Sequence, residues 1–492
     1  MMAQLKFDNS YSRLPDRFFS RVAPTPVSNP SLIRLNRELA EELGLDPDWL
    51  CSEAGVAFLA GNSIPPGATP IAAAYAGHQF GNFVPQLGDG RAILLGEVVG
   101  RGGQRRDIQL KGSGPTPFSR RGDGRAALGP VLREYLVSET MAALGIPTTR
   151  ALAAVSTGDA VFRESVLPGA IITRVASSHI RVGTFQYFAQ RSDHEALRRL
   201  ADYVIERHYP QAGEAERPYH ALLAAVIERQ ADLIANWLLV GFVHGVMNTD
   251  NMSVAGETID YGPCAFLDVY DAGTVFSSID QHGRYAYGNQ PRIAHWNLTR
   301  LAETLLPLLS EDETAAVAEA ESILAAFAPR FEASYQGGLL RKLGLSTKRE
   351  GDEALTSDLL RAMAENGADF TLTFRRLCDV SAPSADREPI RSLFIDPTVF
   401  DRWADRWFQR LQEEPQDSTL RQAAMRAVNP AYIPRNHLVE EMIEAAVERK
   451  DYKPFEELLQ VLSRPYEEQP GRERYSDAPE RSGIPYRTFC GT

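Results

Sequence analysis

The first half of the chain contains two apolar runs that are typical of neighbouring β-strands. Residues 92–99 (AILLGEVV) and 107–111 (DIQLK) are short and rich in apolar side chains, and a Gly-rich stretch at 100–103 separates them. Short apolar runs that are bounded by turn residues predict strands. We therefore expect two antiparallel strands joined by a loop.

Helical spacing of apolar residues dominates the rest of the chain. After a Gly-, Pro- and Arg-rich loop at 112–124, Pro130 suits the first turn of a helix and Gly145 suits its end. Residues 220–243 place apolar side chains at helical spacing, which predicts a core helix. From Leu301 onward, helical runs alternate with breakers. A small sheet followed by many helices predicts an α+β fold.

The overall charge restricts the classes of partner. The chain has 492 residues, with 52 Lys and Arg against 64 Asp and Glu, a formal net charge of −12. Such an acidic balance argues against broad binding to nucleic-acid phosphates or to an anionic membrane surface. We therefore expect no nucleic-acid partner and no membrane partner, and we take a monomer as the working expectation.

The N-terminus and the cysteines favour a cytoplasmic protein. The first eight residues lack the apolar stretch of a secretory signal. The apolar run at 237–243 is far shorter than the roughly 20 residues that span a bilayer. The four cysteines have no CxxC spacing, which excludes a dense disulfide framework and an obvious zinc site; they are Cys51, Cys264, Cys378 and Cys490.

The segment from His244 to Gly262 carries the most informative chemistry. If Ala255 and Gly256 form a two-residue turn, Asn251 lies opposite Asp260 on a short hairpin. Directly facing side chains have Cβ atoms roughly 5 Å apart, so both could bind one hard cation through oxygen. Asp250 could then accept a proton beside the metal. A three-residue turn would shift this register, and Asn and Asp are also common as turn caps.

This segment resembles the active site of protein kinases, in which H-R-D-x-x-x-x-N and D-F-G supply the base and the metal ligands. The spacing from His244 to Asn251 is the kinase spacing, and residues 260–262 read D-Y-G. Val246 occupies the position of the kinase base and cannot accept a proton. Asp250, four residues later, is the candidate replacement.

A strand lysine and a helix glutamate form the second candidate pair. Lys111 ends an apolar strand that is similar to the V-A-I-K strand of kinases, whose lysine contacts phosphates. Glu134 shares a helical face with Val131, Val137 and Met141, so its carboxylate points to the apolar side and requires a cation. Lys111 is the predicted partner. Pairing with adjacent Arg133, or simple edge exposure, is the alternative.

Glycines and arginines near these positions suggest a phosphate pocket. Backbone amides of a G-x-G turn can approach phosphates closely, and the planar guanidinium group can bind two phosphate oxygens. The candidates are Gly88, Gly90 and Arg91 before the first strand, Asp123 and Gly124 in the turn at 120–125, and Arg174 and Arg181 beyond the helix.

Five segments make the chain similar to the selenoprotein O family of pseudokinases. They are residues 75–81 (YAGHQFG), 86–92 (QLGDGRA), 111–120 (KGSGPTPFSR), 247–252 (MNTDNM) and 429–436 (NPAYIPRN). They occur in order over most of the chain. The ending Cys490-Gly491-Thr492 also resembles the family, whose members often have Cys or selenocysteine at this position.

The resemblance implies a two-lobed, protein-kinase-like fold. The corresponding division is an N-terminal extension at 1–74, a kinase-like N-lobe at 75–175, a C-lobe with the catalytic loop and metal site at 176–330, and a helical region with a tail at 331–492.

The resemblance also implies protein AMPylation. ATP would bind in an inverted orientation, and AMP would be transferred to Ser, Thr or Tyr hydroxyls of protein substrates. Asp250 would be the base, and Asn251 and Asp260 would hold Mg²⁺ or Mn²⁺. Glu134 would orient Lys111, and the nucleotide would be surrounded by Lys111, Arg174, Arg181, Asp123, Gly124, Gly88, Gly90, Arg91 and Asp260.

Three further interpretations remain open from the sequence. The family suggests redox control through Cys490, for which Cys264 is the most suggestive disulfide partner. The alternative is that Cys264 is a small buried apolar residue and Cys490 an exposed thiol of the tail. A conventional kinase that uses Asp250 as its base is one alternative function. A catalytically inactive kinase-like scaffold, favoured by Val246, is the other.

Overall fold

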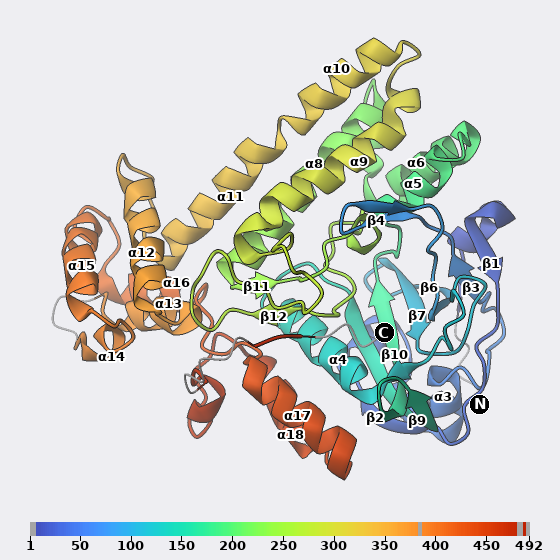
Figure 1. Cartoon of the computed structure of the whole chain (residues 1–492), viewed down its shortest axis with the longest axis horizontal. Helices are drawn as coiled ribbons and strands as arrows, with labels where there is room; N and C mark the ends of the chain where they lie inside the picture. The colour runs from blue at the N-terminus through green and yellow to red at the C-terminus, as the bar shows by residue number, and fades with distance from the viewer. Residues whose placement is uncertain (1–5, 382–385, 480–485, 489–492) are drawn as a thin grey trace.

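The computed structural model describes residues 6–381, 386–479 and 486–488. An eight-stranded antiparallel sheet lies on one side of the molecule, and most of the remainder is helical, with two further two-stranded sheets (Figure 1). The strand order is β1-β3-β6-β7-β10-β9-β2, with β8 paired to β10. The fold is mixed α+β with a C-terminal helical region, as the sequence predicted.

The two predicted strands form the middle of this sheet. They are β6 (Ala92–Val99) and β7 (Arg105–Lys111), and they pair antiparallel with Ala92 opposite Lys111. The other long strands are β9 (Arg150–Phe162) and β10 (Val166–Ala176), and β8 (Ala126–Ala127) is a short strand beside them. This arrangement places Lys111 directly beside Ile172 of β10.

Residues before position 75 also contribute to the sheet. They supply β1 (Phe19–Arg21), β2 (Ser31–Leu35) and β3 (Ile71–Ala73). Three short helices pack against the sheet core beside them: α1 (Arg37–Glu42), α2 (Pro47–Cys51) and α3 (Glu53–Leu59). The N-terminal segment therefore shares a hydrophobic core with the central strands.

Helix α4 (Leu128–Ala143) is the predicted helix with Pro130 in its first turn, and it packs against β9 and β10. Helices α17 (Asn436–Arg449) and α18 (Lys453–Leu462) cover α4 from the outside (Figure 1). Their apolar side chains form one core cluster with those of α4. The last long helices of the chain thus stabilise the helix that carries Glu134.

The predicted core helix at 220–243 is α8 (Pro218–Leu239), and it ends four residues earlier than expected. Gly241 has a φ of +76°, which breaks the helix, and Phe242–Val243 form strand β11 instead. Strand β11 pairs with β12 (Ala265–Phe266). This small pairing brackets the segment from His244 to Pro263 and brings its two ends together.

The other helices surround α8 or form a distal cluster on the side of the molecule away from the sheet (Figure 1). Those near α8 are α5 (Val182–Ala189), α6 (His194–His208), α7 (Pro210–Gly213), α9 (Gln290–Leu309), α10 (Glu313–Leu324) and α11 (Phe327–Lys342). The cluster contains α12 (Asp352–Asn366), α13 (Phe370–Asp379), α14 (Glu388–Arg391), α15 (Pro397–Leu411) and α16 (Ser418–Arg426). Within the described ranges, no helix is long and apolar enough to cross a membrane.

Candidate active site

A cavity of about 490 Å³ collects most of the residues that the sequence singled out. Its walls come from the turn before β6, the end of β7, the Gly-rich loop after β7, strand β10 and the segment between β11 and β12. The predicted residues that line it are Gly88, Gly90, Arg91, Lys111, Asp123, Gly124, Arg174, Arg181, Asp250, Asn251 and Asp260. Val246 also lines it. Glu134 lies behind this wall.

The structure brings together Lys111 and Glu134, whose Nζ and Oε2 atoms lie 2.6 Å apart. The glutamate is only 2 % exposed, and the three apolar residues that share its helical face are buried as well. Its other carboxylate oxygen bonds to Arg174 Nε. Arg174 in turn reaches Asp260 Oδ1 at 2.6 Å. Two acids and two cations therefore form one continuous buried chain.

Burial and neighbouring charge set the protonation of this chain. Burial, reinforced by the charge of Arg174, lowers the pKa of Lys111 to about 8. Burial alone would raise the pKa of Asp260, but Arg174 and Arg181 hold it well below its ordinary value. In the same way, Arg174 and Lys111 outweigh burial and lower the pKa of Glu134. Both carboxylates are ionised at neutral pH.

Arg181 forms a second cationic wall of the cavity. Its guanidinium lies 3.3 Å from Asp260 Oδ2 and 4.5 Å from the centre of the Tyr75 ring. Asp89, which is 2 % exposed, lies 4.0 Å from Arg181 and accepts a hydrogen bond from the backbone N–H of Ala73. Tyr75 and Asp89 were missed as site residues, although both belong to segments that carry the family resemblance.

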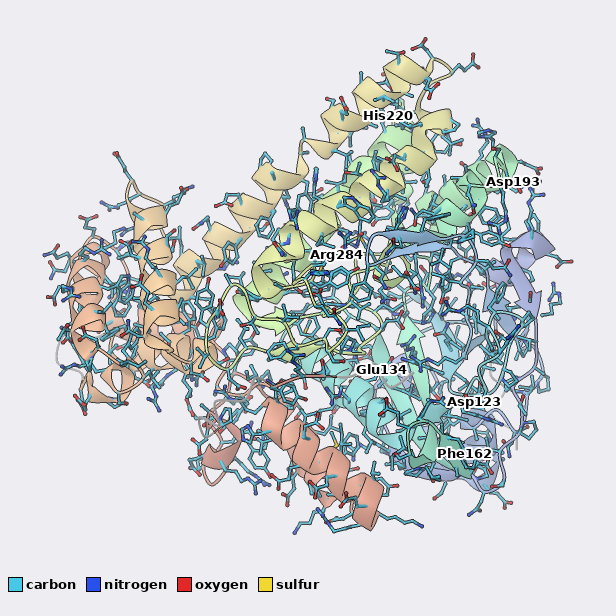
Figure 2. All side chains as sticks on the ribbon, viewed as in Figure 1. Asp123, Glu134, Phe162, Asp193, His220 and Arg284 are labelled. Atoms are coloured by element: carbon cyan, nitrogen blue, oxygen red, sulfur yellow. The ribbon has the colours of Figure 1, made fainter. Side chains whose placement is uncertain are left out.

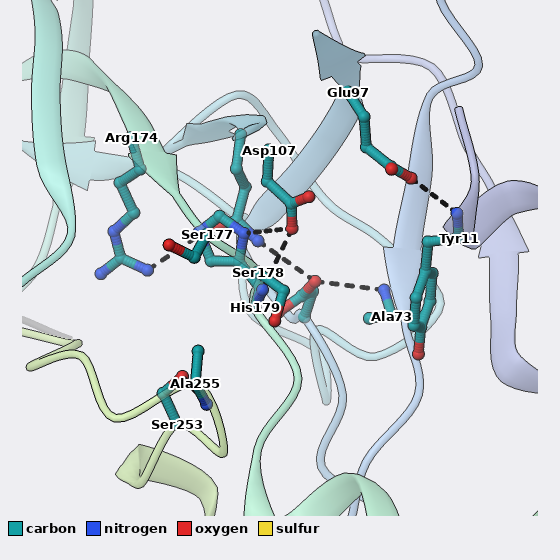
Figure 3. Close-up of polar contacts among 12 residues, drawn as sticks. Tyr11, Ala73, Glu97, Asp107, Arg174, Ser177, Ser178, His179, Ser253 and Ala255 are labelled. Carbon is teal, nitrogen blue, oxygen red and sulfur yellow. Dashed lines mark hydrogen bonds and ion pairs between the residues drawn. The ribbon is translucent and has the colours of Figure 1, made fainter. Parts of the chain in front are cut away.

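A buried polar network supports these side chains from the far side (Figure 3). Gln109 Nε2 donates to Asp89 at 3.3 Å, and its Oε1 accepts from Arg174 at 3.4 Å. Near them, Asp107 accepts from both the backbone N–H and Nδ1 of His179 at 3.0 Å. Gln109 of β7 therefore fixes the positions of two cavity residues, Asp89 before β6 and Arg174 of β10.

The hairpin of β4 (Gly77–Gln79) and β5 (Asn82–Val84) holds the candidate base segment. The His78 N–H donates to Thr249 Oγ1 at 2.7 Å, and the Phe80 N–H donates to Asn248 Oδ1 at 3.1 Å. Gln79 Nε2 donates to Asp250 Oδ2 at 3.2 Å. Three successive residues of the segment at 75–81 thus contact three successive residues at 248–250.

Asp250 combines deep burial with an unused oxygen. It lies in a 3-10 turn (Thr249–Asn251), and its Oδ1 has no hydrogen-bond partner among the described residues. Burial raises the pKa of Asp250 to about 6, although the charge of Arg181 opposes that shift. A cavity-lining carboxylate with a pKa of about 6 is suited to take a proton.

The predicted hairpin that would place Asn251 opposite Asp260 is wrong. Ser253 forms its bridge with Arg181, and Thr258 forms its bridge with Thr148. The two arms therefore pair with neighbouring segments rather than with each other. Asp260 also has a φ of +62°, which is incompatible with a regular strand. Asn251 and Asp260 still line the same cavity, because the pairing of β11 with β12 brings the two ends of the segment between these strands together.

The oxygen donors of Asn251 and Asp260 fit a hard divalent cation. Asn251 Nδ2 donates to the carbonyl of Val246 at 3.0 Å, which leaves its Oδ1 as the free atom. No group of three or more His, Cys, Asp or Glu in the described part of the chain could hold a metal ion without other ligands. Mg²⁺ is commonly held by one or two protein oxygens together with phosphates and water.

Two of the predicted glycines are required by the backbone. Gly88 has a φ of +70°, and a Cβ there would lie 2.3 Å from the Phe118 ring. Gly124 has a φ of +66°, and a Cβ there would lie 2.1 Å from the backbone of Gly114. Asp123 forms an ion pair with Arg163, with Oδ2 and Nη1 2.9 Å apart. The Gly-rich loop is thereby folded tightly against the turn before β6.

Of the two candidate redox residues, the structure describes Cys264. Cys264 is buried, and burial raises the pKa of its thiol to about 12. Cys490 lies outside the described residues. Thr488, two positions earlier, donates from its Oγ1 to the carbonyl of Pro263 at 2.7 Å. The described chain therefore passes beside the residue that precedes Cys264.

Comparisons with known proteins identify close relatives over the full length. The model of the family described as "Protein adenylyltransferase SelO" matches residues 1–463. A "Protein nucleotidyltransferase YdiU" from Methylorubrum populi is 71% identical, and one from Bradyrhizobium sp. (strain ORS 278) is 67% identical. A third, from Rhodopseudomonas palustris (strain BisB5), is 66% identical. In each case the match covers 100% of this chain and 100% of the relative.

Proposed function

Because the chain belongs to the SelO family, it is a protein adenylyltransferase, and we propose that it transfers AMP from ATP to Ser, Thr or Tyr hydroxyls of other proteins. In this proposal ATP lies inverted relative to its orientation in kinases, with its α-phosphate facing Asp250. The residues of the 490 Å³ cavity carry the reaction. The fold expected with this function is kinase-like, with its lobes at 75–175 and 176–330.

The observation that carries the proposal is the carboxylate of Asp250. Val246, at the position of the kinase base, has an aliphatic side chain and cannot accept a proton. Asp250 is 7 % exposed and lines the cavity, and burial raises its pKa to about 6. Its Oδ1 is buried without a hydrogen-bond partner among the described residues, and Gln79 donates to its other oxygen at 3.2 Å. An acceptor hydroxyl that enters the cavity would give its proton to this carboxylate.

The proposed step is a substitution at the α-phosphorus. Asp250 accepts the proton of the acceptor hydroxyl, and the oxygen forms a bond to the α-phosphorus. The bond from the α-phosphorus to the bridging oxygen of the β-phosphate breaks, and pyrophosphate leaves. General base catalysis by a positioned carboxylate typically contributes 10²- to 10⁴-fold to the rate.

The cations of the site would balance the charge of the triphosphate. Lys111 is oriented by Glu134 at 2.6 Å, and Arg174 and Arg181 are both held by Asp260. Hydrogen-bond donors that folding has already oriented need no reorganisation during the reaction. Gly88, Gly90, Arg91, Asp123 and Gly124 would border the nucleotide, since they line the same cavity. Asn251 and Asp260 would hold Mg²⁺ or Mn²⁺, which would neutralise phosphate charge as a Lewis acid.

A dual-label transfer assay tests this proposal. The enzyme is incubated with an acceptor protein and with ATP that carries the radiolabel in either its α- or its γ-phosphate. The proposal predicts that only the α-label becomes protein-bound. Transfer of the γ-label alone would indicate a conventional kinase. Transfer of neither label, with Mg²⁺ and with Mn²⁺, would indicate an inactive scaffold.

A further inference from the structure

Arg284 lies beside the candidate base segment as a cation without an acidic partner. Its guanidinium carbon lies 4.8 Å from the centre of the Trp296 ring and 5.7 Å from that of Tyr285. Figure 2 labels it near the middle of the molecule. Stacking on aromatic rings fixes the direction of a guanidinium but leaves its charge uncompensated.

Arg284 forms no ion pair with a carboxylate of the described residues, and its buried Nε atom has no hydrogen-bond partner among them. The acidic residue closest to Arg284 in sequence is Asp280, and its carboxylate binds backbone N–H groups. Its two oxygens accept the backbone N–H groups of Arg284 and Tyr285 at 2.9 and 2.8 Å. Arg284 is half-buried, so its charge, which no carboxylate of the described residues balances, stays open to a carboxylate from another molecule.

The position of Arg284 connects it to the base segment. Tyr285, its neighbour in sequence, donates its hydroxyl hydrogen to Asn248 Oδ1 at 2.6 Å. The same Asn248 oxygen accepts the N–H of Phe80, which lines the cavity. A Cβ on Gly81, the next residue, would lie 3.6 Å from the Arg284 guanidinium carbon. Arg284 itself does not line the cavity.

We propose that Arg284 binds a carboxylate of the acceptor protein, so that the enzyme prefers Ser, Thr or Tyr residues that have an Asp or Glu nearby in sequence. This inference rests on the proposed function, because it assigns an acceptor subsite to the same centre. The nucleotide fills the cavity, and the acceptor must approach Asp250 from its rim. The Arg284 guanidinium does not line the cavity and lies beside Gly81, which follows the cavity residue Phe80, so it would contact the acceptor and not ATP.

A second arginine at the same ring provides a matched control. Arg300 also stacks on Trp296, with its guanidinium carbon 5.1 Å from the ring centre. It differs from Arg284 because it forms an ion pair with Glu303 at 2.7 Å. If stacking on Trp296 alone explained both arginines, their replacement would have the same effect. If Arg284 is a carboxylate receptor, only its replacement changes the acceptor preference.

The test uses pairs of synthetic peptides that contain one hydroxyl residue. Members of a pair differ only by Glu or Gln at one of the three positions on either side of the hydroxyl residue. Peptide binding is measured by fluorescence anisotropy in the presence of a non-hydrolysable ATP analogue, and AMP transfer is measured in parallel. A charge-assisted hydrogen bond predicts about tenfold tighter binding of the Glu peptide at one or more positions.

The variants distinguish carboxylate binding by Arg284 from a purely structural role of its stacking on Trp296. Arg284→Gln should remove the Glu preference, Arg284→Glu should reverse it in favour of the Gln peptide, and Arg300→Gln should keep it. The affinity for ATP should be unchanged in all three. Wild-type enzyme that binds Glu and Gln peptides equally at every position would overturn the inference, and so would weakened ATP binding by Arg284→Gln. Binding preference without any AMP transfer would support the subsite and contradict the proposed reaction.

Discussion

Gly77 lies against the carboxylate of Asp250 so closely that a Cβ atom at position 77 would lie 2.5 Å from Asp250 Oδ1. That oxygen is also the one without a hydrogen-bond partner among the described residues. The absence of a side chain at Gly77 therefore leaves room for the carboxylate of Asp250, whose Oδ1 is buried against this glycine. The geometry of the base depends on a residue that is remote in sequence.

Gly77→Ala should displace Asp250 and slow AMP transfer by about 100-fold, because small misplacement of a catalytic group has effects of this size. Nucleotide binding should be nearly unchanged, since the cationic side of the cavity is untouched. Gly337→Ala is the control: its Cβ would meet only Arg341 Nη1, at an ordinary 3.6 Å. Transfer rates of both variants, together with ATP affinity, check this prediction. Normal activity of Gly77→Ala would contradict the dependence of the base on this close contact.

Glu134→Gln should be far more destabilising than Lys111→Met. Glu134 neutralises both Lys111 and Arg174, so its loss leaves buried positive charge uncompensated. Removing one partner from a buried charge pair typically costs about 3 kcal/mol or more. Lys111→Met leaves Glu134 paired with Arg174 and should cost about 1 kcal/mol. Free energies of unfolding from urea titrations would test the order, and equal losses would contradict the ion-pair chain.

ATP affinity should decrease as pH rises from about 7 to 9, because the pKa of Lys111 is lowered to about 8 by burial and by Arg174. The lysine is protonated below that pKa and loses its attraction for phosphate above it. A bound triphosphate would favour the protonated form of Lys111 and so raise the pKa of this lysine in the complex. Lys111→Met should bind ATP more weakly and lose most of the pH dependence. Calorimetric titrations at several pH values would measure the ATP affinity. A pH profile of the variant equal to that of the wild type would contradict the assignment of Lys111 as a phosphate-binding residue.

Hydrogen peroxide should form a disulfide between Cys264 and Cys490 if the redox hypothesis is correct. Peroxide is reduced to two molecules of water while the two thiols are joined. Thr488 contacts the carbonyl of Pro263, so the described chain end approaches Cys264. Oxidised wild-type protein should migrate faster than reduced protein on a non-reducing gel, whereas Cys490→Ser and Cys264→Ala should not change. Identical mobility of oxidised and reduced wild type would end this hypothesis.

Local patterns were sufficient to predict the elements around the site. The apolar face of α4 correctly predicted a buried Glu134, and the strand pattern predicted the end of β7 at Lys111. The arrangement of Asn251 and Asp260 could not be predicted in the same way. Their segments pair with Arg181 and Thr148, which are distant in sequence, and these long-range pairings overrule the local turn.

The residues that were missed act through tertiary contacts. Gln79 contacts Asp250 across 171 positions, and Gln109 contacts Arg174 across 65. Nothing in the spacing of a single segment indicates such a contact. The motif at 75–81 signalled that this hairpin matters, but only the fold shows that it fixes the base segment. Arg284 likewise becomes informative only when its lack of an acidic neighbour is visible.

Mass spectrometry of an acceptor protein most directly tests the central claim, that Asp250 activates a hydroxyl for AMP transfer. Wild-type enzyme with ATP and Mg²⁺ or Mn²⁺ should add the mass of an AMP group to Ser, Thr or Tyr residues. Asp250→Asn should bind ATP yet reduce that product by about 10²- to 10⁴-fold. Addition of a phosphate mass by the wild type, or full AMP transfer by Asp250→Asn, would contradict the account.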